Sequence, residues 1–248
     1  MNNKILNISN LTKNFSSKEN IINIINNLSL DIYNGEFISI VGTSGCGKTT
    51  LLNIIGGIDK EYEGNINYYI NKDEIGYMLQ EPALFPWLTI KDNASIALKI
   101  KNTNDDKTID KLLNEYGLNL FENKYPDSLS GGMKQRVALI RTISLKPKLL
   151  LLDEPFAALD YQSRLKIGND LYKLTKKNNI TTIMITHDIA EAISLSDRIV
   201  VLSKRPCNIK KIYTVDIDKN LNPIEKRNDN NFKTYFESIC KDLEIYEK

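Results

Sequence analysis

One stretch constrains the fold of this chain more than any other: Gly42-Thr43-Ser44-Gly45-Cys46-Gly47-Lys48-Thr49-Thr50. Residues 37–41 before it are apolar and rich in β-forming side chains, which predicts a short buried strand. Residues 51–55 after it predict the start of a helix. A Gly-rich loop that joins a strand to a helix is typical of an α/β unit.

The residue types of this loop follow the Walker A pattern, which binds the phosphates of a nucleotide. Its glycines allow backbone conformations that a Cβ would forbid, so successive N–H groups can turn toward one anion. The following helix directs its positive end to the same point. Lys48 can reach the β- and γ-phosphates, and the Thr49 hydroxyl can ligate Mg²⁺. The alternative is a Gly-rich turn without a ligand, which would not need the flanking strand and helix.

A second group of candidate residues follows a run of four leucines. Residues 149–152 predict a buried parallel strand that ends in Asp153 and Glu154. Ligands of open α/β sheets bind at the carboxyl ends of the strands. Asp153 can therefore hold Mg²⁺, directly or through water, and Glu154 can orient or deprotonate a water for attack on the γ-phosphate. Such a run says little alone, but downstream of the Walker A loop it indicates a nucleotide-hydrolysing site.

A second Gly-rich anion site is expected at Leu129-Ser130-Gly131-Gly132-Met133-Lys134-Gln135-Arg136. Ser130 is a candidate N-cap of a helix, and the N–H groups of Gly131 and Gly132 can meet phosphate oxygens. One nucleotide does not obviously need two such sites in one chain. Two chains arranged head-to-tail would each offer this site to the other's nucleotide. The alternative is a plain helix N-cap.

Composition and length exclude several classes of protein. The chain has 248 residues, 42% of them apolar, enough for one large domain or one domain with an inserted lobe. The net charge of +2 gives no electrostatic argument for a nucleic-acid partner. We find no run near the ~18 apolar residues of a membrane span, and no secretory signal. The unpatterned Cys46, Cys207 and Cys240 fit a reducing compartment. We expect the cytoplasm, with membrane contact only through a partner.

Strands that alternate with helices predict an α/β fold with a largely parallel sheet. Turns are expected at Asn34-Gly35 and Glu63-Gly64. We expect a helical lobe over about 85–145, inserted into a core of about 4–84 and 146–215. We also expect an amphipathic helix over about 223–248, which docks on the chain's own core or, alternatively, on a partner. Strands are expected at residues 5–10, 21–32, 37–41, 65–70, 75–79, 148–152, 180–186 and 198–202, and further helices at 160–177 and 188–195.

The motifs in their order resemble the nucleotide-binding subunits of ATP-binding-cassette (ABC) transporters over roughly residues 4–205. The family's motifs match the Walker A loop, Gln80 as the Q-loop, 129–135 as the signature, 149–154 as Walker B, 158–160 as the D-loop and 186–188 as the H-loop. The resemblance implies a P-loop NTPase core of the ABC ATPase type, with an antiparallel β subdomain and an inserted helical subdomain, as one domain over 1–248. It also implies a dimer that closes on two MgATP and reopens after hydrolysis.

The same resemblance implies a role for each matched residue. Phe15 stacks on adenine, although an aromatic at this place is often Tyr. Glu154 is the catalytic base, His187 contacts the γ-phosphate, and Gln80 senses the partner. His187 is the only histidine, and a lone histidine would otherwise be interpreted as structural or solvated. The ATP contacts are assigned to Gly42, Thr43, Ser44, Gly45, Cys46, Gly47, Lys48, Thr49 and Thr50; Mg²⁺ to Thr49, Gln80 and Asp153; and the contacts across the dimer to Ser130, Gly131, Gly132 and Asp160.

Two details of the resemblance favour an importer. Residues 154–160 look like importer ATPases, and 84–90, with 201–206, are similar to the nitrate/sulfonate/taurine subfamily, which also includes transporters of thiamine-precursor pyrimidines. Residues 52–59 instead resemble the lipoprotein-release group, so an ATPase of a lipoprotein-release or macrolide exporter is one alternative. Another is a nucleotide-switched dimerisation module with little turnover.

Partners follow from the importer interpretation. They are a second copy of the chain, transmembrane permease subunits and, indirectly, an extracytoplasmic solute-binding protein, with the chain at the cytoplasmic face of the membrane. Residues 82–90 are expected to line a groove for a permease helix. The alternative for Trp87 is a core aromatic of the helical lobe. Alkylation of Cys46, inside the phosphate loop, is expected to block nucleotide binding.

Overall fold

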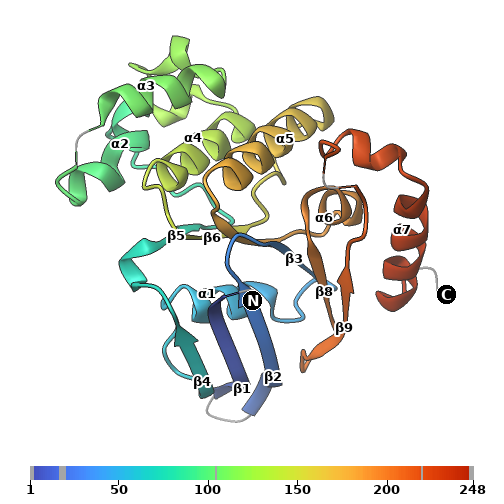
Figure 1. Ribbon diagram of the computed structural model, residues 1–248. Coiled ribbons are helices and arrows are strands. Elements are labelled where there is room, and N and C mark those ends of the chain that lie inside the picture. Colours follow the sequence, from blue (N-terminus) through green and yellow to red (C-terminus); the bar gives the residue numbers. More distant parts are fainter. Residues whose placement is uncertain (1–2, 17–20, 104, 219, 246–248) are drawn as a thin grey trace.

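Two β-sheets organise the molecule (Figure 1). The computed structural model describes residues 3–16, 21–103, 105–218 and 220–245. The central sheet has six strands, and all neighbours are parallel except the last pair. In spatial order they are β5 (Ile75–Met78), β6 (Leu149–Asp153), β7 (Thr181–Ile185), β3 (Phe37–Val41), β8 (Arg198–Leu202) and β9 (Ile209–Thr214). This arrangement confirms the predicted α/β class.

The central strands are unbroken apolar runs because both faces of the sheet are covered. In β6 the alternation of side chains divides the four leucines between two cores. Leu150 and Leu152 pack into the cluster formed with α4 (Gly131–Ile143) and α5 (Tyr161–Lys177), whereas Leu149 and Leu151 pack into the cluster formed with α1 (Lys48–Ile55) and the second sheet. The strand is therefore fixed from both sides, and so are the two carboxylates at its end.

The second sheet is antiparallel and has the order β2 (Ile21–Tyr33), β1 (Lys4–Ser16), β4 (Glu63–Tyr68). Helix α1 (Lys48–Ile55) lies between it and the central sheet (Figure 1). A single apolar cluster joins side chains of all three layers. The predicted turn at Asn34-Gly35 lies between β2 and β3, where Gly35 has a φ of 75°. The antiparallel β subdomain implied by the resemblance is present.

The predicted turn at Glu63-Gly64 is wrong, because both residues begin β4. Gly64 has a φ of 96°, and a Cβ there would lie 2.5 Å from the backbone oxygen of Asn10 in β1. The register between β1 and β4 is irregular at this point. The glycine therefore serves a close approach of two strands rather than a reversal of the chain.

Apart from α1, the helices lie on the side of the central sheet that faces away from the antiparallel sheet, and those of residues 90–143 form the helical region (Figure 1). Gly117 lies just after the end of α3 (Asp106–Glu115) and has a φ of 68°, as a residue after a helix C-terminus often does. Residues 116–130 are largely irregular, with two short 3₁₀ turns. The helices are α2 (Ile90–Ile100), α3 (Asp106–Glu115), α4 (Gly131–Ile143), α5 (Tyr161–Lys177), α6 (Ile189–Leu195) and α7 (Asn230–Asp242).

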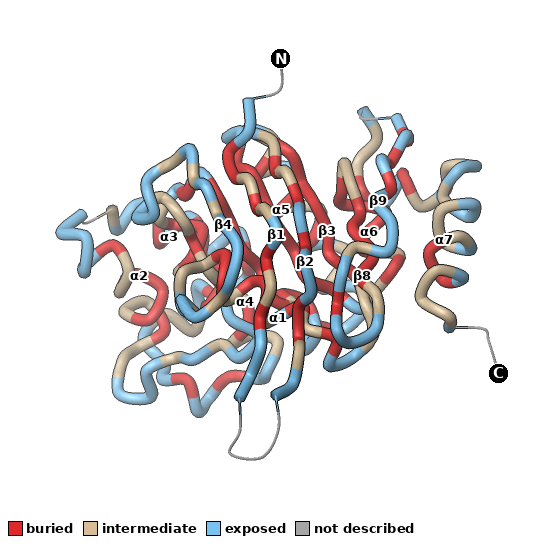
Figure 2. Tube along the Cα trace, turned by 90° about the horizontal axis from the view of Figure 1, so that it is seen from below, coloured by how far each residue is buried: buried red, intermediate tan, exposed pale blue. Residues whose placement is uncertain are grey.

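The C-terminal helix α7 is shorter than the predicted range 223–248, because a 3₁₀ turn occupies Glu225–Asn228 and Asp229 caps α7. Its apolar stripe packs on α6 and β9, with Ile239 fully buried and Phe232 at the margin of the cluster. Figure 2 shows α7 at the edge of the molecule, where most of its residues are intermediate or exposed and only a short part is buried. Docking on the chain's own core is therefore confirmed. Within the described ranges no helix is long and apolar enough to cross a membrane.

Candidate functional site

The Gly-rich loop joins β3 to α1, as predicted. Lys48 begins α1, is buried, and its ammonium group donates to the carbonyl oxygens of Gly42 (2.9 Å) and Thr43 (3.0 Å). Gly45 and Gly47 have φ values of 71° and 124°. A Cβ on Gly47 would lie 3.0 Å from side-chain atoms of both Cys207 and Ile24, so glycine is required there for space as well as for conformation.

Cys46 departs from the prediction made for it. Cys46 is only 1% exposed and belongs to the apolar cluster of α1 and the antiparallel sheet. Its sulfur lies only 2.9 Å from where a Cβ of Gly42 would be. The thiol therefore points into the core, and only the backbone of Cys46 is available to a phosphate. The premise that a thiol reagent reaches this side chain in the folded protein is wrong.

A cleft of about 460 Å³ opens above this loop. It gathers residues from six separated segments of the chain and so brings half of the predicted residues to one place. Of these, it is lined by Phe15, Ser44, Gly45, Gly47, Lys48, Thr49, Thr50, Gln80 and Glu154. It is also lined by three residues that the sequence did not single out, which are Ile22, Ile24 and Arg205.

One part of the cleft lining is apolar and comes from the antiparallel sheet. Phe15 of β1 is 47% exposed, and Ile22 of β2 is 45% exposed. The ammonium group of Lys13 lies 4.8 Å from the centre of the Phe15 ring, a cation–π contact, and also pairs with Asp59 at 2.9 Å. An exposed aromatic ring beside a polar, Gly-rich loop suits a ligand that has one flat apolar part and one anionic part.

Arg205 reaches the phosphate loop from the turn between β8 and β9. Its Nη2 donates to the carbonyl oxygen of Gly45 at 2.7 Å. The same turn is joined to β2, since the Cys207 N–H donates to the Ile24 carbonyl at 2.8 Å. The signal that could have found Arg205 is its place just beyond a predicted strand, at the sheet edge where ligands bind.

Asp153 is the most deeply buried carboxyl group of the site, with 1% of the residue exposed. Neither of its carboxylate oxygens has a hydrogen-bond partner among the described residues. Burial raises the pKa of Asp153, whereas the nearby Thr49 hydroxyl and Lys48 ammonium group lower it and Glu154 raises it. An unpartnered buried carboxylate beside a hydroxyl is a fitting donor set for Mg²⁺, which takes one or two carboxylates together with phosphate oxygens.

Glu154 follows β6 and His187 comes shortly after the neighbouring strand β7, so the two side chains face each other at the end of the sheet. Their side chains meet at 3.2 Å, between His187 Nδ1 and Glu154 Oε2. Glu154 has a φ of 48°, a left-handed conformation that costs a residue with a side chain about 1–3 kcal/mol. Its N–H donates to Ile185 of β7, and its carbonyl oxygen accepts from Gln135 of α4. These bonds hold the carboxylate at the carboxyl edge of the sheet.

The four contacts predicted to act across the dimer, Ser130, Gly131, Gly132 and Asp160, do not line this cleft. Ser130 caps α4 through Met133 N–H, as expected of an N-cap, and Asp160 caps α5. Ser130, Gly131 and Asp160 are exposed. A Cβ on Gly132 would lie 3.0 Å from the Ala158 carbonyl, so the signature segment packs directly on the D-loop. The two segments form one surface, separate from the residues that line the chain's own cleft.

Gln80 follows β5 and is exposed in the cleft. The segment after it presents aromatic side chains to the outside: Trp87 is 70% exposed and Phe85 is 38% exposed, with ring centres 5.4 Å apart. The side-chain amide of Asn93 in α2 holds this segment: its oxygen accepts from the Phe85 N–H, and its nitrogen donates to the Phe85 carbonyl. The interpretation of Trp87 as a core aromatic of the helical lobe is wrong.

Comparison with known proteins identifies relatives. Residues 25–157 match the sequence model of the family described as ABC transporter. The chain is 41% identical over 252 residues to the ABC transporter ATP-binding protein YtlC of Bacillus subtilis, covering 98% of this chain and 97% of that protein. It is 38% identical over 232 residues to the aliphatic sulfonates import ATP-binding protein SsuB of Bacillus licheniformis, covering 90% and 88%.

A solved structure is also similar to the whole arrangement. It is described as the dimeric, post-hydrolysis state of the ATP-binding cassette MJ0796 bound to ADP and Pi. The TM-score is 0.77 at 32% sequence identity, and the match covers 86% of this chain and 100% of that one. The fold described above is therefore that of an ATP-binding cassette.

Proposed function

We propose, from the premise that this chain belongs to the ABC transporter family as an ATP-binding subunit with ATPase activity, that it drives an importer of a small solute. The solute would be of the nitrate, sulfonate, taurine or thiamine-precursor type. The support for import is the 38% identity to the sulfonate import protein over 90% of the chain. We also propose that residues 1–248 act as one domain, with the core and the helical lobe bounded as the sequence suggests and the C-terminal helix over Asn230–Asp242.

The observation that carries the proposed mechanism is the convergence of Lys48, Glu154 and His187 at one edge of the sheet. The adenine ring packs on Phe15, which is half exposed at the apolar part of the cleft. The loop amides and Lys48 bind the phosphates. An ammonium group has three donors, and the two bonds to loop carbonyls leave one for a phosphate oxygen.

Thr49, Gln80 and Asp153 are the residues that would hold Mg²⁺. When bound, the metal offsets the negative charge of the phosphate oxygens and aligns the leaving group. Asp153 would gain the partner that its two buried oxygens lack among the described residues. This gain stabilises the ionised form of a carboxyl group whose pKa burial otherwise raises.

Glu154 is the proposed base. Its carboxylate orients a water and accepts its proton as the oxygen attacks the γ-phosphate. His187 contacts that carboxylate at 3.2 Å, and we propose that it also contacts the γ-phosphate. The strained backbone of Glu154 supports this assignment, because residues with such conformations occur preferentially at active sites.

A second copy of the chain is the proposed partner for the surface formed by Ser130, Gly131 and Asp160. These residues are exposed and do not line the cleft of their own chain. In a head-to-tail dimer they would contact the partner's nucleotide, and Asp160 would link the two sites. The dimeric description of the similar cassette supports this arrangement.

The membrane partner is proposed to bind at residues 82–90, next to Gln80. Trp87 and Phe85 provide exposed aromatic surface there, and aromatic residues are enriched at the energetic centres of protein interfaces. This contact would keep the chain at the cytoplasmic face of the membrane and couple it to an outside solute-binding protein through the permease.

The first test is the oligomeric state of Glu154→Gln with and without MgATP, measured by light scattering. The variant retains the cleft but loses the base, so a monomer should become a dimer when MgATP is added. A Glu154→Gln/Ser130→Phe variant is the control, because the bulky side chain blocks the proposed contact. A chain that stays monomeric at saturating ATP, alone and with its permease, would contradict the shared-site arrangement.

Import is tested separately. The chain and its permease are reconstituted in vesicles with ATP on the side of the chain. The solute-binding protein and labelled sulfonate, taurine, nitrate or pyrimidine are added on the other side. Uptake that depends on ATP supports an importer, and its absence with efflux of the same solutes supports the exporter alternative. A dimer with negligible steady-state hydrolysis would instead favour the nucleotide-switched module.

A further inference from the structure

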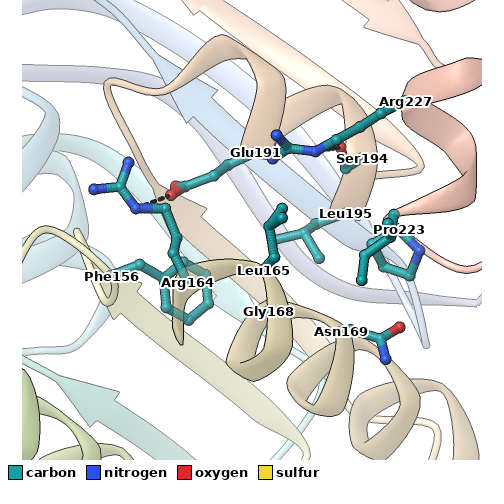
Figure 3. A pocket seen from close by; sticks show the side chains of 11 residues that line it. Phe156, Arg164, Leu165, Gly168, Asn169, Glu191, Ser194, Leu195, Pro223 and Arg227 are labelled. Carbon is teal, nitrogen blue, oxygen red and sulfur yellow. Dashed lines mark hydrogen bonds and ion pairs between the residues drawn. The ribbon is translucent and has the colours of Figure 1, made fainter. Parts of the chain in front are cut away.

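One side chain of α5 bridges the D-loop and the turn that carries His187. Arg164 Nη2 donates to the Leu159 carbonyl at 3.3 Å, and Nη1 donates to Asp188 Oδ2 at 3.2 Å. Its Nε pairs with Glu191 Oε1 at 3.4 Å, the contact drawn in Figure 3. The planar guanidinium group can make these three contacts at once, which the single ammonium group of a lysine cannot reproduce.

The contacts of Arg164 continue into the His187 turn. Asp188 uses its other oxygen, Oδ1, to accept the Glu191 N–H at 3.0 Å and so caps α6. The Thr186 hydroxyl accepts the Asp188 N–H at 3.0 Å and donates to Glu191 Oε2 at 2.7 Å. The residues on both sides of His187 are thus tied to the two carboxylates that Arg164 contacts.

The other end of the bridge is the proposed dimer-facing loop. Leu159 precedes Asp160, which caps α5 through Ser163 N–H at 2.9 Å. Gln135 of α4 accepts the Ala158 N–H at 3.0 Å and donates to the Glu154 carbonyl. A displacement of this loop therefore moves the carbonyl to which Arg164 is bonded.

The surroundings make the bridge rigid. Glu191 is 5% exposed, and Arg164 is the only cation that pairs with it among the residues the structure describes. Phe156, Leu165 and Leu195 pack around the aliphatic side of this region, where only a small cavity of about 20 Å³ remains (Figure 3). When Glu191 is ionised, loss of this cation would leave a buried charge without a partner, which is strongly disfavoured.

We propose that Arg164 is a positioning residue that aligns His187 with Glu154 and transmits the position of residues 158–160 to that pair. Arg164 does not line the nucleotide cleft, so it acts through other side chains rather than on ATP itself. The inference rests on the proposed roles of Glu154, His187 and Asp160. It predicts that the charge and shape of Arg164 affect turnover and leave nucleotide affinity unchanged.

The test compares Arg164→Met and Arg164→Lys with the wild type in the full chain. The dissociation constant for ATP is measured by titration, and kcat from steady-state hydrolysis. We expect ATP affinity within about twofold of wild type and a kcat lower by about tenfold in Arg164→Met. Arg164→Lys should recover part of the loss. Lys166→Met removes an exposed charge from the same helix and should leave both quantities unchanged.

Asp188→Asn provides a second variant that retains a good helix cap but weakens the charged contact with Arg164. If Arg164 acts through Asp188, the kcat of the double variant should be no lower than that of Arg164→Met alone. Circular dichroism at the assay temperature checks that each variant is folded. Should Arg164→Met unfold, Arg164→Lys and Asp188→Asn carry the same test.

The outcomes separate this inference from the proposed function. A wild-type chain without hydrolysis, with or without its permease, overturns the proposed function. An active wild type together with an unchanged kcat in Arg164→Met overturns the positioning role alone. The positioning role is also overturned if Arg164→Met loses ATP affinity as strongly as it loses kcat. It is likewise overturned if the effects of Arg164→Met and Asp188→Asn on kcat are fully additive in the double variant. Either result indicates a general effect on the fold.

Discussion

Glu191 is a buried carboxyl group, and its protonation should link the stability of the fold to pH. Burial raises the pKa of Glu191 from its ordinary value of 4.5 to about 7, because water no longer solvates the charged form. The Thr186 hydroxyl lowers this pKa and the Asp188 carboxylate raises it. Arg164 and His187 lower it further, but the effect of burial remains the largest.

The sign of the effect follows from the two states. Between pH 4.5 and about 7 the folded chain keeps the proton of Glu191 and the unfolded chain releases it. The folded state then binds more protons, so the free energy of unfolding falls as the pH rises. One pH unit corresponds to 1.36 kcal/mol, which gives a loss of about 2.5 kcal/mol between pH 5 and pH 8. Glu191→Gln removes the ionisation but keeps an oxygen for the Thr186 hydroxyl, so the variant avoids this loss.

Thermal unfolding of wild type and Glu191→Gln at pH 5 and pH 8 is the assay. Other groups titrate in both proteins and cancel in the difference between their midpoints. The midpoint of Glu191→Gln minus that of the wild type should be about 5–10 °C larger at pH 8 than at pH 5. Glu237→Gln, at an exposed position of α7, is the matched control and should show no such change. A difference for Glu191→Gln that is the same at both pH values would refute the reasoning.

Three further substitutions test the cleft and its surroundings. Glu154→Gln should bind ATP normally and hydrolyse it about 10²–10⁴-fold more slowly, which steady-state phosphate release measures; near-normal turnover would remove Glu154 from the role of base. Arg205→Met loses the bond to the Gly45 carbonyl and should weaken ATP binding by roughly tenfold, as one charge-assisted hydrogen bond does; an unchanged dissociation constant would contradict a role in shaping the phosphate loop. Trp87→Ala should leave the basal ATPase rate unchanged but weaken permease binding by about 30-fold; unchanged permease affinity and stimulation would exclude this surface.

Much of the fold could be predicted because its signals are local. The apolar runs of β3, β6 and β7 are short and bounded, and the loop between β3 and α1 has a pattern that few other structures require. The error at Glu63-Gly64 arose because a glycine at a strand crossing has the same composition as a glycine in a turn. What distinguishes the two is the backbone of Asn10, which is distant in sequence.

The site was predictable to a similar degree, and its gaps have the same physical origin. Residues in ordered motifs, such as Gln80 and Glu154, line the cleft as expected. Arg164 and Arg205 were missed because their meaning lies in contacts between separated segments; Arg205 bonds to Gly45, 160 residues away. The burial of Cys46 was missed because a motif gives the path of the backbone but not the direction of each side chain.

The parallel strands explain why residues that are far apart in the sequence gather at one edge of the sheet. Each of β3, β5, β6, β7 and β8 ends at the same edge, and the residues that follow them include Lys48, Gln80, Glu154, His187 and Arg205. The sheet thus delivers the chain's own share of the site. Ser130 and Asp160 instead begin α4 and α5, and their two segments meet through Gly132 and Ala158 away from the residues that line the cleft. Both helix starts lie on the same exposed surface, so the proposed head-to-tail dimer would bring another chain's nucleotide to them, and Arg164 would relay that engagement to His187.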